Sequence, residues 1–579
     1  MLIDCKTSLP ELHILHTCSH SILTIRQGRA LLSNGTLSKG SAFPAHERRE
    51  FGLQGLLPSR VQTLDMQVQR AYEQYSQKTT DIGKNTFMTS LKAQNETLYY
   101  KVIQTHLKEM MPIIYTPTEG SAIANYSRLF RGPEGIFLTI EKADEMEGDF
   151  EQVADSDDID IIVVSDGEQI LGIGDQGVGG VLISIAKLVL YTLCAGIHPN
   201  RTLPVVLDCG TDNKELLEDE HYLGLQKPRV RGEEYDAFVD KFVQTARKRF
   251  PKAYIHFEDF GVHNARRILD KYSSEIPCFN DDVQGTGCVT LAAVMAAARG
   301  ADVKVGDLRC VMYGAGTAGT GIADQIADAI ALDSGKSKED AKKQIYCMDQ
   351  QGVVLQSMGE DLNYAQKPYA RPDDEWKDAD TESLLEVIKQ VKPHVLIGTS
   401  TQPGAFTQEV VQEMSKHIDR PMIFPLSNPT KLHEAKPEDL FKWSDGKVLT
   451  ATGSPFDPVE VEGGKKREIA ECNNSVVFPG IGLGTVLSRA KLITSAMLVE
   501  ATKALASQAP AMKDPDAALL PDVEDVREVS VKIAAAVINQ AVKEDVAQEE
   551  GIPESDEDLE EWIRVQMWTA EYRPLKKVA

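Results

Sequence analysis

Apolar positions follow three successive patterns along this chain. Between residues 47 and 111 they recur at three-to-four spacing, which predicts a helical N-terminal region. From residue 159 onward, short apolar runs alternate with helical stretches, which indicates an α/β region. The runs that predict its strands span residues 160–164, 203–207 and 254–257.

The same alternation continues more regularly between residues 308 and 453. Strands are predicted at residues 309–313, 345–348, 394–397, 422–426 and 447–450. The helix after the first of them carries Ile322, Ile326 and Ile330 on one stripe, as expected for a helix packed on a sheet. These features predict a parallel, doubly wound sheet.

The two ends of the chain differ from this middle part. Residues 1–40 are polar and irregular. From Asp522 a helical pattern returns, and an acidic run over residues 549–561 follows it. Ser555 is placed to cap a helix that ends near Trp568. The apolar side chains of Trp562, Ile563 and Trp568 indicate that this tail docks on another domain or subunit.

Charge and cysteine usage narrow the possible partners. The 579 residues carry a formal net charge of −25, whereas nucleic acid and anionic membranes require a basic face, so we expect neither as a partner. An anionic substrate would need a local cation, such as a bound metal ion. The nine cysteines include no CxxC pair, which argues against a disulfide framework or a structural zinc site.

The sequence predicts neither a membrane span nor a targeting signal. The longest apolar run, near residues 289–298, is too short to cross a bilayer. The N-terminal region has no apolar secretory core. Its acids Asp4 and Glu11, and a first arginine only at Arg26, differ from a mitochondrial presequence. We therefore expect a cytoplasmic protein, with the mitochondrial matrix as the alternative.

A glycine fingerprint, Gly314-Ala315-Gly316-Thr317-Ala318-Gly319, lies between a predicted strand and a predicted helix. This context predicts dinucleotide binding: Gly314 permits the tight turn, Gly316 admits the pyrophosphate, and Gly319 permits helix–strand contact. Ala318 lies in the first helical turn, whose N–H groups and dipole attract phosphates. The alternative is a glycine-rich turn without a ligand.

Asp349, at the end of the second strand of this region, is the residue expected to bind the adenosine ribose. It comes 35 residues after Gly314, and a helix capped at Ser337 accounts for the unusual length. Its carboxylate repels a 2′-phosphate, so the sequence favours NAD over NADP. A second glycine match, over residues 172–177, is interpreted as a loop that shapes the active cleft.

Three carboxylates, those of Glu258, Asp259 and Asp282, are the predicted ligands of Mg²⁺ or Mn²⁺. Neighbouring residues of a regular strand point to opposite faces, so Glu258 and Asp259 can share an ion only if their strand ends there. The aromatic residues Phe257 and Phe260 indicate burial, where unpaired carboxylates are costly. The alternative is a set of surface acids or helix caps.

Tyr115 and Lys187 are candidate proton-transfer residues because of their surroundings. Tyr115 lies between two prolines in the segment 111–117, and Lys187 lies within the apolar segment 181–190. A lysine in such a segment is usually at the helix surface, with its ammonium group in water. If Lys187 is buried instead, desolvation favours its neutral form and makes it a possible base.

Taken together, these motifs resemble the malic enzyme family, over nearly the whole chain, and are most similar to the NAD-linked enzymes of fungi and bacteria. The segments that carry the resemblance, in chain order, are residues 111–120, 172–187, 257–261, 279–282, 314–319, 427–430, 473–474 and 478–480.

The resemblance implies oxidative decarboxylation of (S)-malate to pyruvate and CO₂ with NAD. It implies Tyr115 as general acid, Lys187 as general base, and Asp281 as support for the base. It assigns the metal to Glu258, Asp259 and Asp282, and contacts with substrate or nicotinamide ribose to Asn428 and Asn474. It also implies a homotetramer.

One position departs from the family pattern. Many members have an arginine, which clamps the substrate or cofactor, where this chain has Gln169. A glutamine has no bidentate cationic group. Recognition of the substrate carboxylate must therefore depend on the metal, on the asparagines or on another cation.

Three other functions are compatible with parts of the pattern. A malolactic enzyme, which converts malate to lactate, would use the same residues. A non-catalytic metabolite sensor would keep the cofactor site, but the presence of Tyr115, Lys187 and the carboxylates argues against it. A simple 2-hydroxy-acid dehydrogenase needs no metal cluster.

The predicted fold class is α/β, with five parts. These are an irregular segment (1–40), a helical N-terminal domain (41–132), a catalytic α/β domain (133–280 with 471–545), a Rossmann-like NAD-binding domain (281–470) and a C-terminal helical tail (546–579).

Overall fold

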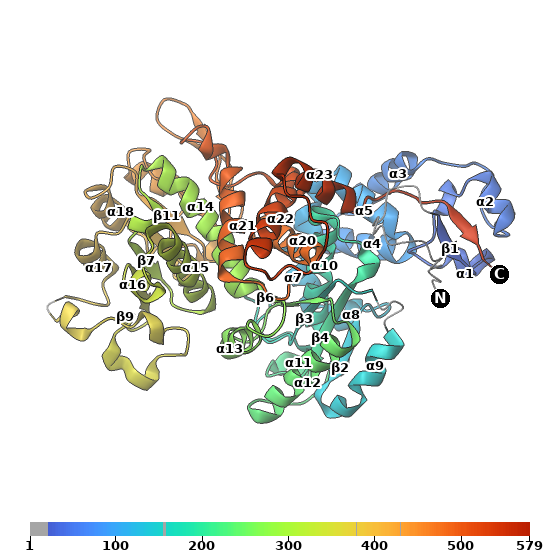
Figure 1. Ribbon diagram of the computed structural model, residues 1–579, viewed down its shortest axis with the longest axis horizontal. Helices are drawn as coiled ribbons and strands as arrows, with labels where there is room; N and C mark the ends of the chain where they lie inside the picture. The colour runs from blue at the N-terminus through green and yellow to red at the C-terminus, as the bar shows by residue number, and fades with distance from the viewer. Residues whose placement is uncertain (1–20, 154–157, 378, 429, 579) are drawn as a thin grey trace. The chain divides into compact units, whose positions relative to one another are not determined.

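The computed structural model describes residues 21–153, 158–377, 379–428 and 430–578. Residues Tyr254–Ile552 form one compact unit, and the described residues before and after them form another. The two are called unit 2 and unit 1 here, and each is described by itself (Figure 1). Residues 1–20, with the acids Asp4 and Glu11 used to predict the compartment, lie outside the described residues.

Unit 1 begins with helices, as the apolar spacing predicts. The main ones are α3 (Leu64–Ser76), α4 (Asp81–Gln94), α5 (Glu96–Thr105), α6 (Leu107–Ile114), α7 (Thr118–Ala124) and α8 (Tyr126–Leu129). Side chains of Thr63, Thr80 and Asn95 cap the first three by accepting hydrogen bonds from free backbone N–H groups. Two short elements precede them within the segment expected to be irregular, β1 (Ile22–Thr24) and α1 (Gly28–Leu32).

Three parallel strands of unit 1 lie in the order β2 (Ile136–Thr139), β4 (Thr202–Asp208), β3 (Ile161–Ser165). Helices α9 (Met146–Val153), α11 (Lys214–Glu218) and α12 (Glu233–Arg249) connect or flank them. Every residue of β3 is buried, which explains why its sequence is apolar without alternation.

Helix α10 (Val181–Ala195) packs on β3 and β4. With its preceding turn, the stretch Gly177–Ala195 has the length and apolarity of a membrane-crossing helix, yet 89% of it is buried inside the protein, as in a core helix. This stretch is longer than the apolar run near residues 289–298. The interior of unit 1 accounts for its apolarity.

The C-terminal tail folds back within unit 1. Helix α23 (Asp556–Gln566) is capped by Ser555, as predicted. The backbone N–H of Trp568 donates to the carbonyl of Gly196 at 2.7 Å, and its ring lies edge-on to Tyr100. Strand β16 (Leu575–Lys577) then pairs in parallel with β1. The predicted docking of the tail is confirmed.

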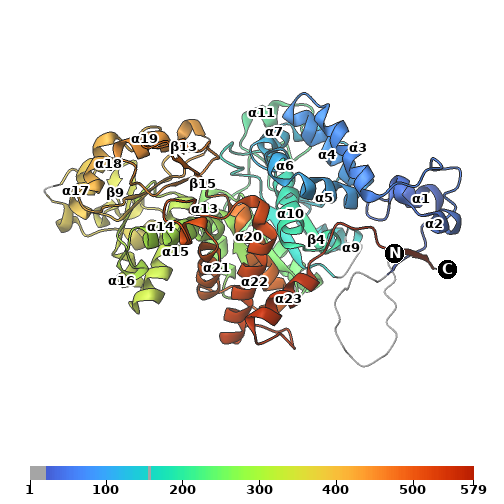
Figure 2. The same ribbon diagram turned by 90° about the horizontal axis from the view of Figure 1, so that it is seen from above.

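Unit 2 starts with the parallel strands β5 (Tyr254–Phe257) and β6 (Cys278–Asn280), joined through α13 (Val262–Tyr272). Helix α14 (Thr286–Gly300) follows. Near the end of this unit α20 (Phe478–Ser488), α21 (Ser495–Ser507) and α22 (Val526–Lys543) lie side by side (Figure 2).

The second sheet of unit 2 has five strands in the order β11 (Met422–Pro425), β10 (Val395–Gly398), β7 (Cys310–Tyr313), β8 (Ile345–Asp349), β9 (Gly352–Val353). All are parallel except β9. In register, Val311, Leu396 and Ile423 lie in one row and share a buried core with α17 (Leu384–Val391), α18 (Gln408–Ser415) and α19 (Pro437–Trp443). Helices α15 (Thr317–Ser334) and α16 (Lys338–Lys342) connect β7 to β8. The predicted doubly wound α/β fold is confirmed.

The fifth predicted strand of this region, at residues 447–450, is reduced to a single parallel bridge between Leu449 and Met422 of β11. The N–H of Leu449 donates to the carbonyl of Pro421 at 2.9 Å, whereas the side chain of Ser444 accepts the N–H of Val448 at 3.1 Å. Strand β12 (Ala451–Thr452) follows and pairs with β15 (Ala470–Glu471).

Candidate active site

The carboxylates of Glu258 and Asp259 follow the end of β5 directly. The strand ends at Phe257, and Asp259 has a left-handed backbone with φ of 52°. This conformation removes the strand alternation that would send the two side chains to opposite faces. Oxygens of Glu258, Asp259 and Asp282 all lie within 4.8 Å of one another.

Asp282 reaches this cluster from the neighbouring strand. Because β5 and β6 are parallel, with Phe257 opposite Asn280, their carboxyl ends meet at one edge. Beyond β6 the chain makes a π-helical turn, Asp281–Gly285, a geometry that occurs often at functional sites. The backbone N–H of Asp259 donates to Oδ2 of Asp282 at 2.9 Å, which fixes that carboxylate. Three carboxylate groups at this spacing suit a hard divalent cation such as Mg²⁺ or Mn²⁺.

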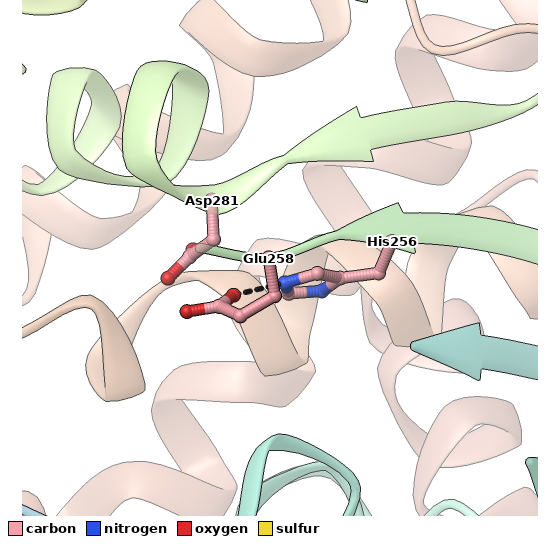
Figure 3. A group of neighbouring side chains, drawn as sticks. All are labelled: His256, Glu258 and Asp281. Atoms are coloured by element: carbon pink, nitrogen blue, oxygen red, sulfur yellow. Dashed lines mark hydrogen bonds and ion pairs between the residues drawn. The ribbon is translucent and has the colours of Figure 1, made fainter. Parts of the chain in front are cut away.

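Asp281 is held beside Glu258 by a separate set of contacts (Figure 3). The side-chain amide of Asn474 donates to Oδ2 of Asp281 at 2.9 Å and to its carbonyl at 3.2 Å. A Cβ atom on Gly285 would lie 1.9 Å from Oδ1 of Asp281, so only glycine leaves room for this carboxylate. Asn474, which the sequence predicts as a substrate contact, therefore positions Asp281.

The glycine fingerprint joins β7 to α15. Gly314 has φ of 115°, and a Cβ there would lie 2.5 Å from the backbone of Thr399. A Cβ on Gly319 would lie 1.9 Å from the carbonyl of Gly314, so the helix and strand touch here. Gly316 has open space around it, and Ala318 is half-buried in the first turn of α15. This geometry leaves the free N–H groups of α15 open to a phosphate.

Asp349 ends β8 and has an exposed side chain. The amide of Gln366, which is buried, donates both to Oδ2 of Asp349 and to the carbonyl of Ala315. Among the described residues, the ion pairs do not include Asp349. A glutamine rather than a cation beside this acid is consistent with a ribose that has no 2′-phosphate.

Tyr115 and Lys187 meet in unit 1. Tyr115 directly follows α6, and Lys187 is the only charged residue of α10. The Nζ atom of Lys187 lies 5.4 Å from the centre of the Tyr115 ring. Lys187 is 2% exposed, so its ammonium group is buried and does not reach water. A buried lysine beside a tyrosine is an arrangement suited to proton transfer.

Comparison with known proteins decides the family. Sequence profiles of two domains match the chain, described as malic enzyme, N-terminal domain (residues 92–273) and malic enzyme, NAD binding domain (residues 283–542). The chain belongs to the malic enzyme family.

Similar malic enzymes occur in fungi, bacteria and protists. The Saccharomyces cerevisiae protein named NAD-dependent malic enzyme, mitochondrial, is 50% identical over 562 residues, which are 95% of this chain and 83% of that protein. The Bacillus subtilis protein named NAD-dependent malic enzyme 3 is 49% identical over 564 residues, which are 96% of this chain and 98% of that protein. The crystal structure of Entamoeba histolytica malic enzyme, 24% identical, shares the fold with a TM-score of 0.55 over 89% of this chain and 90% of that chain.

In this malic enzyme Gln169 is exposed on the loop that follows β3. Two cations that contact neighbouring residues of this loop, Arg229 and Arg231, pair with acids. Arg229, whose side chain is fully buried, holds Asp175 with two hydrogen bonds of 3.0 and 2.7 Å and donates to the carbonyl of Asp166. Arg231 pairs with Glu168 and Asp212. Arg229 thus fastens the glycine loop 172–177, a role that the sequence analysis did not find.

Asn428 follows β11 on a loop held by Glu434, another residue that the sequence analysis missed. The carboxylate of Glu434 is completely buried (0% exposed) and accepts from Ser400 N and Oγ, each at 2.9 Å, and from Ser427 Oγ. Ser400 lies beyond β10 and Ser427 beyond β11. Glu434 therefore fastens two loops at the carboxyl ends of adjacent strands, where α/β sheets bind ligands.

Proposed function

We propose that this chain catalyses the NAD-dependent oxidative decarboxylation of (S)-malate to pyruvate and CO₂, with Mg²⁺ or Mn²⁺ as cofactor. Relatives that are 49–50% identical over nearly the whole chain are named NAD-dependent malic enzymes. The observation that carries the proposal is the cluster of Glu258, Asp259 and Asp282, whose oxygens lie within 4.8 Å in the same unit as the glycine fingerprint. A simple dehydrogenase has no use for such a cluster.

Each of these residues has a separate role in the proposed reaction. Lys187, in its neutral form, takes the proton of the C2 hydroxyl while the C2 hydride passes to NAD. Tyr115 then gives a proton to C3 after CO₂ has left, which yields pyruvate. Asp281 supports the base. Glu258, Asp259 and Asp282 would hold the divalent ion, whose positive charge would stabilise the enolate that forms on loss of CO₂.

The cofactor and substrate contacts belong to the same proposal. Gly314, Gly316, Ala318 and Gly319 admit the pyrophosphate, and Asp349 accepts hydrogen bonds from the adenosine ribose. Asn428 and Asn474 contact malate or the nicotinamide ribose. Gln169 stands where the substrate-clamping arginine of many family members stands, so the metal and the asparagines bind the malate carboxylates in its place.

Assembly and compartment are also proposed from the family. A homotetramer follows from the resemblance. A cytoplasmic location remains our prediction, with the mitochondrial matrix as the alternative, since the Saccharomyces cerevisiae relative is named as mitochondrial.

The decisive experiment follows NADH absorbance with malate, NAD and Mn²⁺. We expect steady growth of the signal, its loss with a chelator, slower turnover with NADP, and pyruvate as product. Lys187→Ala should lower kcat by about 10²-fold or more if Lys187 is the base. Lactate as the product without net NADH would identify a malolactic enzyme. Absence of any malate turnover would refute the proposal.

A further inference from the structure

We propose that His256 is a positioning residue for the metal ligand Glu258 and sets the affinity of the site for Mg²⁺ and Mn²⁺. It would do so by holding one carboxylate oxygen of Glu258, so that the other faces the ion. This inference rests on the metal-binding role proposed for Glu258, Asp259 and Asp282.

The contact between the side chains of His256 and Glu258 is short, and both side chains are buried. His256 lies in β5, and Glu258 comes two residues later, so both point to the same side of the chain. Nε2 of His256 lies 2.6 Å from Oε2 of Glu258, and the side chains are 0% and 2% exposed (Figure 3). An ionised carboxylate can only accept, so Nε2 carries the proton and donates. Such charge-assisted hydrogen bonds are among the stronger ones in proteins.

Aromatic neighbours fix the imidazole in this orientation. The centre of the Phe279 ring, on the paired strand β6, lies 5.6 Å from the centre of the imidazole, with 67° between the ring planes. For Phe478 the distance is 5.6 Å and the angle 89°. The ring of Tyr254 lies 6.4 Å away at 62°. Edge-to-face packing on these rings leaves the imidazole little freedom to turn. The direction of the N–H donor is therefore set before any ion binds.

A role as a direct ligand is the competing interpretation, because His256, Glu258 and Asp281 also lie within 4.8 Å of one another. Two ligands of one octahedral Mg²⁺ ion, each at about 2.1 Å, are about 3 Å apart. The 2.6 Å between Nε2 and Oε2 is shorter than that and fits a hydrogen bond. Hard cations also prefer oxygen ligands. His256 therefore acts through Glu258.

Fixing the ligand in advance should strengthen metal binding. Residues that hold a metal ligand by a hydrogen bond typically change metal affinity by about 10- to 100-fold when mutated. Without His256, Glu258 would lose one of the donors that orient its carboxylate, and a buried carboxylate pays for a lost donor. Both effects weaken the binding of Mg²⁺ and Mn²⁺ to the site, with or without malate.

The test compares two substitutions of the full-length protein. His256→Phe keeps an aromatic ring of similar size and removes the donor, whereas His256→Gln keeps an N–H group that can reach the carboxylate. The readout is the Kd of Mn²⁺ without substrate, measured from the electron paramagnetic resonance signal of free Mn²⁺. We expect an increase of about 10- to 100-fold for His256→Phe and of less than about threefold for His256→Gln.

Controls separate this inference from the proposed metal site. NAD binding, followed by fluorescence, should stay within about twofold in both variants, which shows that unit 2 is folded. If His256→Phe does not fold, His256→Asn replaces it, because its shorter amide does not reach Glu258. An unchanged Mn²⁺ affinity without the donor, or the same loss in His256→Gln as in His256→Phe, would overturn the inference. Unchanged Mn²⁺ binding in Glu258→Gln would instead overturn the metal site itself.

Discussion

Single residues of the carboxylate cluster depend on backbone features that most residue types do not allow. Asp259 has a left-handed backbone, which costs an ordinary residue about 1–2 kcal/mol but is tolerated by aspartate. Gly285 leaves the space that the carboxylate of Asp281 fills. The local backbone therefore places both acids.

Gly285→Ala should disable Asp281 without disturbing the fold. The backbone of Gly285, with φ of −66°, suits alanine, so the main cost is the clash with Asp281, whose Oδ1 would lie 1.9 Å from the new Cβ; Nδ2 of Asn474 would lie 3.3 Å away. Asp281 must turn away from Asn474, and we expect kcat to fall about tenfold or more, because small displacements of catalytic groups are costly. Steady-state kinetics with malate and NAD give the measurement. Gly148→Ala, where a Cβ meets nothing within 4 Å, is the matched control, and equal kcat values for the two variants would contradict the prediction.

At this scale, local sequence patterns revealed some residues and concealed others. The fingerprint glycines, Asp349 and the clustered acids could be named because their meaning depends on immediate neighbours. Arg229 and Glu434 could not, because each is defined by partners that the folded chain brings together. Arg229 meets Asp175 across 54 positions, and Glu434 meets Ser400 across 34. For His256 a signal existed: two residues before Glu258 on a strand means the same face.

Elements were predictable to the extent that packing agrees with local pattern. Strands β5, β7, β8, β10 and β11 lie within one or two residues of their predicted positions, since each is an apolar run buried in a sheet. Of the strand expected at residues 447–450, only Leu449 pairs with the sheet, through a bridge to Met422, while Ser444 accepts the N–H of Val448. The burial of Lys187 in α10 needed the tertiary structure, because α10 is apolar on all sides and its pattern marks no side as facing water.

Helix α7 makes unit 1 sensitive to pH through Glu119. Burial raises the pKa of Glu119 to about 8, although a hydrogen bond from Asn85 and the charge of Lys92 act in the opposite direction. The raised pKa means that the folded state favours the neutral acid. Its contribution to stability is complete below the ordinary pKa, near 4.5, and is lost as the pH rises through about 8.

Glu119→Gln should therefore become relatively more stable as the pH rises. Between pH 5 and pH 8.5 we expect its Tm to gain about 3 °C or more on that of the unmodified protein, because the ionisation cost reaches up to about 1.4 kcal/mol per pH unit. Thermal unfolding across this pH range gives the measurement. Glu73→Gln on α3, at an exposed position, should show a difference independent of pH. A constant Tm difference for Glu119→Gln would show that Glu119 is ionised in the folded protein.

On the scale of the whole molecule, segments far apart in sequence complete the same unit. The tail from residue 553 onward belongs to unit 1, and Leu575 of β16 shares a small core with Leu31, Phe43 and Phe51. Unit 1 therefore acquires its full set of contacts only when the last part of the chain is in place.

Trp568→Ala should destabilise unit 1. The indole is buried against Tyr100 and His198, and truncation of a buried tryptophan costs about 3–5 kcal/mol. We expect the Tm to fall by about 5 °C or more in thermal unfolding. Val565→Ala, on the same tail but 44% exposed, should change Tm by about 1 °C or less. Similar Tm values for the two variants would mean that the tail adds nothing to the stability of unit 1.

The apolar character of α10 has a consequence for the synthesis of this enzyme. While a ribosome is still extending the chain, the stretch that becomes α10 is a long apolar segment of unit 1, and the strands that will cover it are not all paired. It is therefore the segment most prone to aggregate or to recruit chaperones before folding is complete. Its only ammonium group is Lys187. Protein engineers who seek higher yield by adding charge to this stretch would be altering the helix that carries the proposed base.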